Sequence, residues 1–248
     1  MSWRVIPLET HDAFINMAID EAVSEAVASG KSIATIRFYR WKPSAVSIGY
    51  FQGMHDEVDV AKCKEQGVDV VRRRTGGGAV YHDADGEITY SVAVPEKELN
   101  LGITESYRLI CGWIVGSLAT LGIKAEFKPI NDIIVGGKKI SGNAQTRRNG
   151  VVLQHGTILY DVDVDTMFSL LKVPDEKIRD KMIAAVKERV TRVLDFTQAS
   201  KQELYEALVK GFTEGKAWSF GKLTEHEKQR AQELAAARYT TDGWNFMR

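Results

Sequence analysis

The sequence lacks the features that define disulfide-rich, zinc-binding, secreted and membrane proteins. It contains only two cysteines, Cys63 and Cys111, in 248 residues, which is too few for a disulfide framework and lacks the paired spacing of a zinc site. No basic segment followed by an apolar one opens the chain, and no apolar run reaches the ~18 residues of a membrane helix. These absences predict a cytoplasmic protein that has no signal peptide and no membrane partner.

The sequence also lacks a net charge. Lysine plus arginine equals aspartate plus glutamate at 33 each, so no overall field attracts nucleic acid or an anionic membrane. No repeat, low-complexity tract or linker divides the chain. We therefore expect one globular domain over residues 1–248, without a nucleic-acid partner.

The first part of the chain alternates between helix and strand patterns. Apolar residues recur at helical spacing over 14–27, and Gly30 supplies a stop. Runs at 34–39 and 46–51, separated by Lys42-Pro43-Ser44, predict two strands that form an antiparallel pair. Further patterns predict helices at 58–65 and 107–121 and strands at 68–72 and 87–94, the second helix being largely buried.

The later part changes from strands to helices. Short β patterns at 125–128, 133–135, 138–141 and 151–160 surround Gly136-Gly137, a hairpin signal. Beyond residue 160, helices are predicted at about 163–171, 175–188, 201–213 and 224–238, with no strong strand among them. The fold class is thus α+β, with a sheet-rich core at 1–160 and a helical remainder at 161–248.

A glycine-rich cluster is the first candidate site. In RRRTGGGAVYHD, a strand enters Gly76, Gly77 and Gly78 after three arginines. Glycines let backbone N–H groups approach an anion closely, and the arginines can add charge-assisted bonds. The alternative is a glycine-rich turn with solvated arginines. The motif matches neither the P-loop nor the dinucleotide fingerprint.

A lysine-containing hairpin is the second candidate. If Lys138 faces solvent, alternation along the strand turns Lys139 inward, where it needs a negative partner. The alternative is a surface hairpin with two solvated lysines. Asp132 can be a magnesium ligand or a turn residue, and His155 can be either a functional residue or a satisfied core histidine.

Taken in order, these segments resemble the catalytic domain of lipoate–protein ligases, in the superfamily that also holds biotin ligases and octanoyltransferases. The resemblance rests on NMAIDEA, RFYRW, IGYFQ, RRRTGGGAVYHD, INDIIVGGKKISGNAQ, LQHGTIL, KVPDEKIRDK and KERVTRV, which together span most of the chain. It implies a biotin/lipoyl-ligase-like fold with mixed, mostly antiparallel sheets flanked by helices.

The resemblance also implies a function. It predicts an ATP- and Mg²⁺-dependent lipoate–protein ligase that forms lipoyl-AMP from lipoate or octanoate and then modifies a lysine of an acceptor protein. Lys139 would be the catalytic residue and Asp132 the metal ligand. The implied binding residues are Arg73, Gly76, Gly77, Gly78, Ala79, Val80, Tyr81, His82, Asn131, Asp132, Ser141, Gly142, His155 and Thr157.

Partners follow from the same resemblance. The acceptor would be a lipoyl domain or a glycine-cleavage carrier protein. Bacterial-type ligases carry a further C-terminal domain that this sequence lacks, so we expect a bipartite enzyme with a separate small accessory subunit.

The alternatives are a cysteine-dependent octanoyltransferase and a non-catalytic lipoate-binding protein. The octanoyltransferase branch that shares the GKK hairpin places its cysteine about where residues 124–128 stand, and no cysteine lies there. Cys111 is expected in a buried helix and Cys63 on a surface helix, both poor positions for a nucleophilic thiolate. A biotin ligase fits less well, because its glycine- and arginine-rich loop differs.

Overall fold

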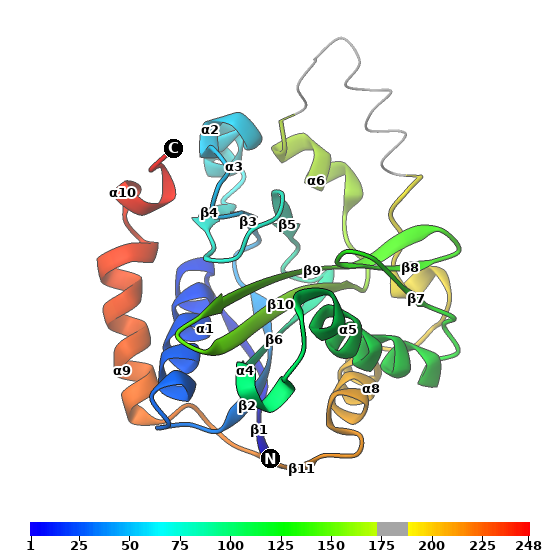
Figure 1. The fold of residues 1–248 in the computed structure, drawn as a ribbon. Coiled ribbons are helices and arrows are strands. Elements are labelled where there is room, and N and C mark those ends of the chain that lie inside the picture. Colours follow the sequence, from blue (N-terminus) through cyan, green and yellow to red (C-terminus); the bar gives the residue numbers. More distant parts are fainter. Residues whose placement is uncertain (173–187) are drawn as a thin grey trace.

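The computed structural model describes residues 1–172 and 188–248, and a large mixed sheet forms its centre (Figure 1). The strand order is β11-β1-β2-β6-β10-β9-β8-β7. The strands are β1 (Ser2–His11), β2 (Ala34–Trp41), β6 (Glu87–Pro95), β7 (Glu126–Lys128), β8 (Asp132–Val135), β9 (Lys138–Arg148), β10 (Val151–Leu159) and β11 (Ala217–Phe220). Most neighbours are antiparallel, but β1 pairs in parallel with both β2 and β11.

A second, three-stranded sheet carries the glycine-rich cluster. Its order is β4-β3-β5, with β3 (Ala45–Ile48) between β4 (Asp69–Arg72) and β5 (Val80–His82). The short helices α2 (Met54–Glu57) and α3 (Val60–Glu65) connect β3 to β4. The glycine segment joins β4 to β5, so it is held at both ends by this small sheet.

Helices cover both faces of the large sheet. On one face, α1 (Ala13–Ala28) and α9 (Glu225–Leu234) pack together, and on the other α5 (Ile103–Thr120) packs with α8 (Lys201–Thr213) (Figure 1). The remaining helical segments are α4 (Glu96–Leu99), α6 (Val164–Leu170), the 3-10 turn Val193–Asp195, the π-helical turn Ala235–Tyr239 and α10 (Asp242–Asn245).

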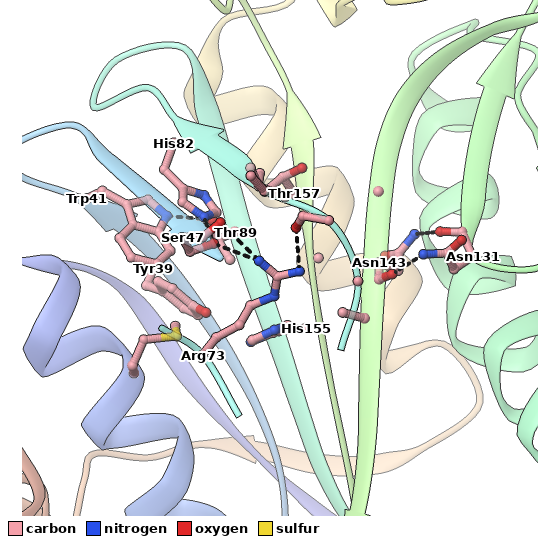
Figure 2. A pocket seen from close by; sticks show the side chains of 18 of the residues that line it. Tyr39, Trp41, Ser47, Arg73, His82, Thr89, Asn131, Asn143, His155 and Thr157 are labelled. Carbon is pink, nitrogen blue, oxygen red and sulfur yellow. Dashed lines mark hydrogen bonds between the residues drawn. The ribbon is translucent and has the colours of Figure 1, made fainter. Parts of the chain in front are cut away.

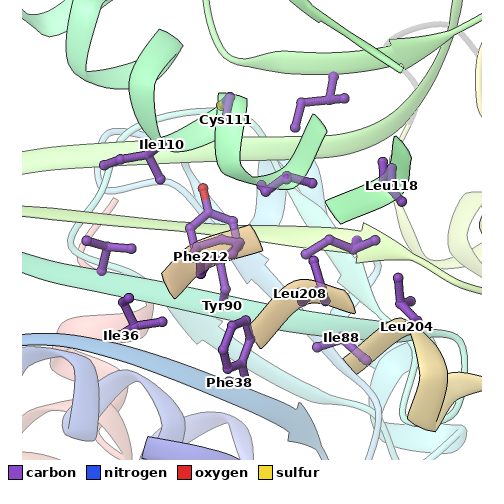
Figure 3. Packing of buried hydrophobic residues seen from close by; sticks show 14 of the residues in the cluster. Ile36, Phe38, Ile88, Tyr90, Ile110, Cys111, Leu118, Leu204, Leu208 and Phe212 are labelled. Carbon is purple, nitrogen blue, oxygen red and sulfur yellow. The ribbon is translucent and has the colours of Figure 1, made fainter. Parts of the chain in front are cut away.

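Strand alternation divides the core between the two faces. In β2, Ile36 and Phe38 belong to the cluster under α5 and α8, whereas Tyr39 belongs to the cluster under α1. Figure 3 shows the first cluster, in which Phe38 and Phe212 meet edge to face at 5.3 Å between ring centroids. This packing makes the large sheet a rigid base for side chains that project toward the small sheet.

The structure confirms the predicted α+β class, the long helices and the Gly136-Gly137 hairpin, where both glycines have positive φ (56° and 81°). The predicted antiparallel pairing of 34–39 with 46–51 is wrong, because β2 and β3 lie in different sheets. Three strands, β1, β5 and β11, were not predicted. The expected helix at 175–188 lies almost wholly outside the described residues.

The helix expected to be largely buried, α5, buries one face only, and several of its residues are exposed. In the described part of the chain, no helix combines the length and apolar character needed to cross a bilayer.

Candidate active site

A cavity of about 140 Å³ lies between the two sheets. Its walls come from β2, β6, β9 and β10 of the large sheet, from β3 and β5 of the small sheet, and from α1. Figure 2 shows the labelled polar side chains gathered around Arg73, with Asn131 and Asn143 on the opposite side. The lining residues are Met17, Tyr39, Trp41, Ser47, Arg73, Gly77, Gly78, Ala79, Val80, His82, Thr89, Asn131, Lys139, Gly142, Asn143, Ala144, His155, Gly156 and Thr157.

The glycine loop is built around the Arg73 side chain. The guanidinium donates to the carbonyl oxygens of Gly76 (2.9 Å) and Gly78 (2.7 Å), and Gly77 has a positive φ of 97°. A Cβ on Gly49 would lie 2.0 Å from the carbonyl oxygen of Gly77, so the two glycines allow two backbone segments to touch. Arg73 therefore shapes the loop as well as lining the cavity.

The two flanking arginines are engaged elsewhere. Arg72 donates to the carbonyl oxygens of Gly49, Tyr50 and Gln52, and Arg74 forms an ion pair with Glu21. They are neither solvated, as one interpretation of the sequence held, nor aimed at the cavity, as the other held.

Lys139 reaches the same cavity from the hairpin. Its amine forms a 2.7 Å ion pair with Asp132, and its side chain passes over Gly142, where a Cβ would lie 2.7 Å from both Cε and Nζ. The side chains of Lys139 and Asp132 are 42% and 34% exposed. The predicted inward lysine with a negative partner is therefore present, but it stands at the mouth of the cavity and is not buried.

A pair of asparagines holds the strands beside this lysine. The Asn131 side chain donates to the carbonyl oxygen of Asn143 (2.6 Å), and the Asn143 side chain donates to that of Asn131 (2.9 Å). The Tyr90 hydroxyl donates to Oδ1 of Asn143 (2.7 Å). Asn143 was not predicted as a site residue, since its role depends on partners from β6 and from the loop before β8.

A buried ionic network supports the floor of the cavity. Asp20 accepts from Arg37 (3.0 Å), and it lies 3.2 Å from Nδ1 of His155. Burial alone would raise the pKa of Asp20, but the His155 hydrogen bond and the Arg37 charge hold that pKa below its usual value. Burial lowers the pKa of His155 despite the nearby Asp20 carboxylate, which favours the neutral imidazole.

Most of the predicted site residues share this cavity. Its wall includes Arg73, Gly77, Gly78, Ala79, Val80, His82, Asn131, Lys139, Gly142, His155 and Thr157. Gly76, Tyr81, Asp132 and Ser141 do not line it. Tyr81 packs in the apolar cluster under the small sheet, because alternation in β5 turns it away from its neighbours Val80 and His82.

Comparison with known proteins places these features in a family. The lipoyl protein ligase A/B catalytic domain matches residues 12–213. An octanoyltransferase LipM from Brevibacillus brevis is 37% identical, with 99% of both chains covered. The chain belongs to the lipoyl protein ligase A/B catalytic-domain family.

Solved structures agree with this membership. A bi-partite lipoate protein ligase from Thermoplasma acidophilum, described together with its E2 lipoyl domain, is 37% identical, covers 99% of this chain and 96% of its own, and superposes with a TM-score of 0.90. A T. acidophilum protein solved with bound lipoic acid is 34% identical over the full length of both chains, with a TM-score of 0.86. The predicted biotin/lipoyl-ligase-like fold is confirmed.

The same comparisons correct the predicted activity. Eight curated relatives that match 98–99% of this chain, at 34–38% identity, are named octanoyltransferase LipM. The main prediction, an ATP-dependent lipoate–protein ligase, is therefore wrong, and the octanoyltransferase alternative is better supported. The sequence misled because relatives of both names, octanoyltransferase and lipoate protein ligase, match this chain at 37% identity over nearly its whole length.

The cysteines of this family member lie away from the cavity. Cys63 and Cys111 are both fully buried, and neither is a lining residue. Burial raises the pKa of Cys63 to about 11 and that of Cys111 to about 12. Both thiols are therefore protonated near neutral pH. Cys63, expected on a surface helix, points into the small-sheet core.

The cavity also offers few side chains that could bind a metal ion. Among the residues that the structure describes, no three His, Cys, Asp or Glu side chains come together to hold a metal. Asp132, the predicted magnesium ligand, is a single carboxylate already paired with Lys139. The residues therefore do not fit a dedicated protein cage for Mg²⁺.

Proposed function

We propose that this chain transfers an octanoyl group from a thioester carrier to a lysine of a lipoyl domain. The main support is the near full-length match to LipM octanoyltransferases. The alignment with the B. brevis enzyme covers 99% of each chain. The T. acidophilum relative was described with its E2 lipoyl domain, which supports a lipoyl domain as the acceptor. A separate accessory subunit stays a prediction.

The cavity suits the acyl chain of such a substrate. Met17, Ala79, Val80 and Ala144 contribute apolar wall, and the volume of about 140 Å³ fits a slender ligand segment. Burying the six methylenes of an octanoyl group at ~0.8 kcal/mol each would contribute roughly 5 kcal/mol. The acyl carbonyl would then lie toward the polar groups at the cavity mouth.

The overall reaction needs no nucleotide. The acceptor amine gains a bond to the acyl carbon, the carbon–sulfur bond of the donor breaks, and the amine proton ends on the released thiol. Negative charge develops on the carbonyl oxygen during this exchange. The Lys139 ammonium at the cavity mouth is placed to offset that charge, and a positioned donor of this kind contributes most where water is partly excluded.

A transfer assay with purified components tests the proposal. The chain is mixed with octanoyl-acyl carrier protein and an unmodified lipoyl domain, with and without ATP and Mg²⁺, and the lipoyl domain is weighed by mass spectrometry. We expect one octanoyl group on the acceptor lysine without ATP, and none on a lipoyl domain with that lysine changed to arginine. Modification that requires ATP and a free fatty acid would overturn the proposal.

A further inference from the structure

The arginine that precedes Arg73 is held by the C-terminal segment, residues 238–245. The Arg72 backbone N–H donates to Oδ1 of Asn245 (2.9 Å), and the Trp244 indole donates to the Arg72 carbonyl oxygen (2.8 Å). The Arg72 guanidinium donates in turn to the carbonyl oxygens of Trp244 and Asn245, both at 3.0 Å. Four hydrogen bonds therefore join Arg72 to residues that lie 172 and 173 positions later in the chain.

The arginine that follows Arg73 is held by the same segment through Glu21 of α1. Glu21 forms ion pairs with both Arg74 and Arg238, and its second oxygen accepts from the Tyr239 hydroxyl (2.7 Å). Glu21 is 3% exposed and Tyr239 is 1% exposed, so water competes little for these contacts. Both neighbours of Arg73 are thus tied to the C-terminal segment.

Arg72 also connects this segment to the glycine loop. Its side chain is fully buried, and it donates to the carbonyl oxygens of Gly49 (3.3 Å) and Tyr50 (3.0 Å). The Tyr50 N–H donates to the Thr75 carbonyl oxygen (2.9 Å), and Gly49 lies against the backbone of Gly77. One buried guanidinium therefore ties the C-terminal segment to backbone that touches the glycine loop.

The C-terminal segment lies beyond residues 12–213, the part of the chain that the family model matches. In this later part, α9 packs on α1, and α10 contacts β4 at the edge of the small sheet (Figure 1). None of residues 238–245 lines the cavity. An effect of this segment on the reaction must therefore act through the arginines and the loop that it holds.

We propose that Trp244 and Asn245 are positioning residues, which hold the glycine loop in the shape that receives the octanoyl chain. This inference rests on the proposed function, because Ala79 and Val80 at the end of the loop belong to the apolar wall that we assign to that chain. If the loop samples other shapes, only the fraction of molecules with the right shape binds the chain, and the apparent affinity falls by that fraction.

The catalytic lysine is supported differently. Lys139 lies on β9, which pairs with β8 and β10 of the large sheet, and the C-terminal segment does not contact it through Arg72 or Arg74. Loosening the glycine loop should therefore weaken substrate binding and leave the charge at the cavity mouth in place. The expected signature is a rise in KM with little change in kcat.

Trp244→Phe tests the proposal with the smallest change. It removes the indole donor to the Arg72 carbonyl oxygen and keeps an aromatic ring. We expect the KM for octanoyl-acyl carrier protein to rise about fivefold, with kcat within about twofold of the wild type. The matched control is Trp218→Phe on β11, whose ring contacts Phe220, and it should keep both constants. A wild-type KM in Trp244→Phe, or a loss confined to kcat, would overturn the proposal.

A pair of substitutions at Asn245 separates the hydrogen bond from the bulk of the side chain. Asn245→Ala leaves the buried Arg72 N–H without its acceptor and should raise KM about tenfold. Asn245→Asp keeps an oxygen at that place, although it loses the donor to the Tyr239 carbonyl oxygen, and should recover most of the affinity. Equal KM values for the two variants would show that this bond does not position the loop. If Asn245→Ala does not fold, the Trp244→Phe result still decides the question.

Hydrogen–deuterium exchange examines the loop without any substrate. The amides of Tyr50 and Arg73 are hydrogen-bonded to the carbonyl oxygens of Thr75 and Ile48. In Trp244→Phe, these two amides should exchange about fivefold faster or more, while the amides of β10 keep their wild-type rates. Unchanged exchange, or an equal increase in β10, would overturn a local positioning role.

The exchange result distinguishes this inference from the proposed function. If the wild type does not modify a lipoyl domain but Trp244→Phe shows the local increase, the proposed function fails and the hold on the loop stands. If the wild type transfers octanoyl and Trp244→Phe equals it in both KM and exchange, the positioning role fails and the proposed function stands.

Discussion

Replacing Lys139 with alanine removes the ammonium group that we place near the acyl carbonyl. Loss of one preformed donor to a developing oxyanion lowers kcat by ~10²–10³, or about 2.7–4 kcal/mol. The Lys139 side chain is 42% exposed and forms an ion pair with Asp132, so water and the carboxylate screen part of its charge. We therefore expect a decrease near the lower end, about 100-fold.

The same substitution should barely affect folding. An ion pair as exposed as that of Lys139 with Asp132 contributes ~0–1 kcal/mol to stability, so the melting temperature should change by only a few degrees. The matched control is Lys138→Ala, since Lys138 is the exposed neighbour on the same strand and does not line the cavity. It should retain the wild-type rate.

The assay is the ATP-free transfer of octanoyl from its carrier protein to a lipoyl domain, followed by mass spectrometry over time. kcat and KM are measured separately, because a group that acts on the transition state should change kcat more than KM. Equal rates for Lys139→Ala and Lys138→Ala would refute the role of Lys139. A loss confined to KM would assign Lys139 to substrate binding alone.

Three further substitutions or conditions probe the frame of the site. Gly49→Ala should cost ~1–3 kcal/mol of stability and most of the activity, because its Cβ would meet a glycine-loop carbonyl oxygen at 2.0 Å. The control Gly76→Ala, which has open space around its Cβ, should fold like the wild type. Equal melting temperatures for the two variants would contradict this prediction. Asp20→Ala should cost ~3–5 kcal/mol in urea unfolding by leaving Arg37 buried and unpaired, and a loss below ~1 kcal/mol would show that the pair is not needed. The pKa values of His155 and Asp20 are lowered in the folded state, so as the pH falls the unfolded chain takes up these protons before the folded chain does. The melting temperature should therefore fall as the pH drops below ~6.5 and again below ~4. A melting temperature that rises between pH 7 and pH 5 would contradict this prediction.

The sequence predicted two segments that line the cavity, and the reason is that both carry signals between near neighbours in the chain. Three consecutive glycines after a strand and a Gly-Gly turn before Lys139 are signals that depend on near neighbours in the chain. The structure brings these segments to one cavity. The sequence could not predict how deeply each side chain is buried. Lys139, at 42% exposed, is more exposed than expected.

The errors concern strand partners that are distant in sequence. β2 and β3 are adjacent in the chain with a proline between them, which suggested a hairpin. However, β1 and β6 already occupy both edges of β2, so β3 must pair elsewhere. β1 itself was missed because Pro7 interrupts its pattern; the structure tolerates that proline where the register with β2 shifts between Ile6 and Glu9.

Ser47 and Asn143 line the cavity but were not predicted, for a related reason. Each is a single polar residue in an otherwise ordinary strand, and each forms its hydrogen bonds with partners from other strands or loops. Ser47 meets His82 only because β3 and β5 pair, and His82 meets Glu87 only because the small sheet packs on β6. A buried hydroxyl in a strand gives no signal of this kind in the sequence.

The source of the transferred acyl group is the most direct test of the central claim. In one reaction, the purified chain and an unmodified lipoyl domain receive unlabelled octanoyl-acyl carrier protein together with deuterium-labelled free octanoate, ATP and Mg²⁺. Mass spectrometry of the lipoyl domain then reports which octanoyl group reached the lysine. Our account predicts the unlabelled group, and a lipoyl domain that carries the deuterated group would contradict it.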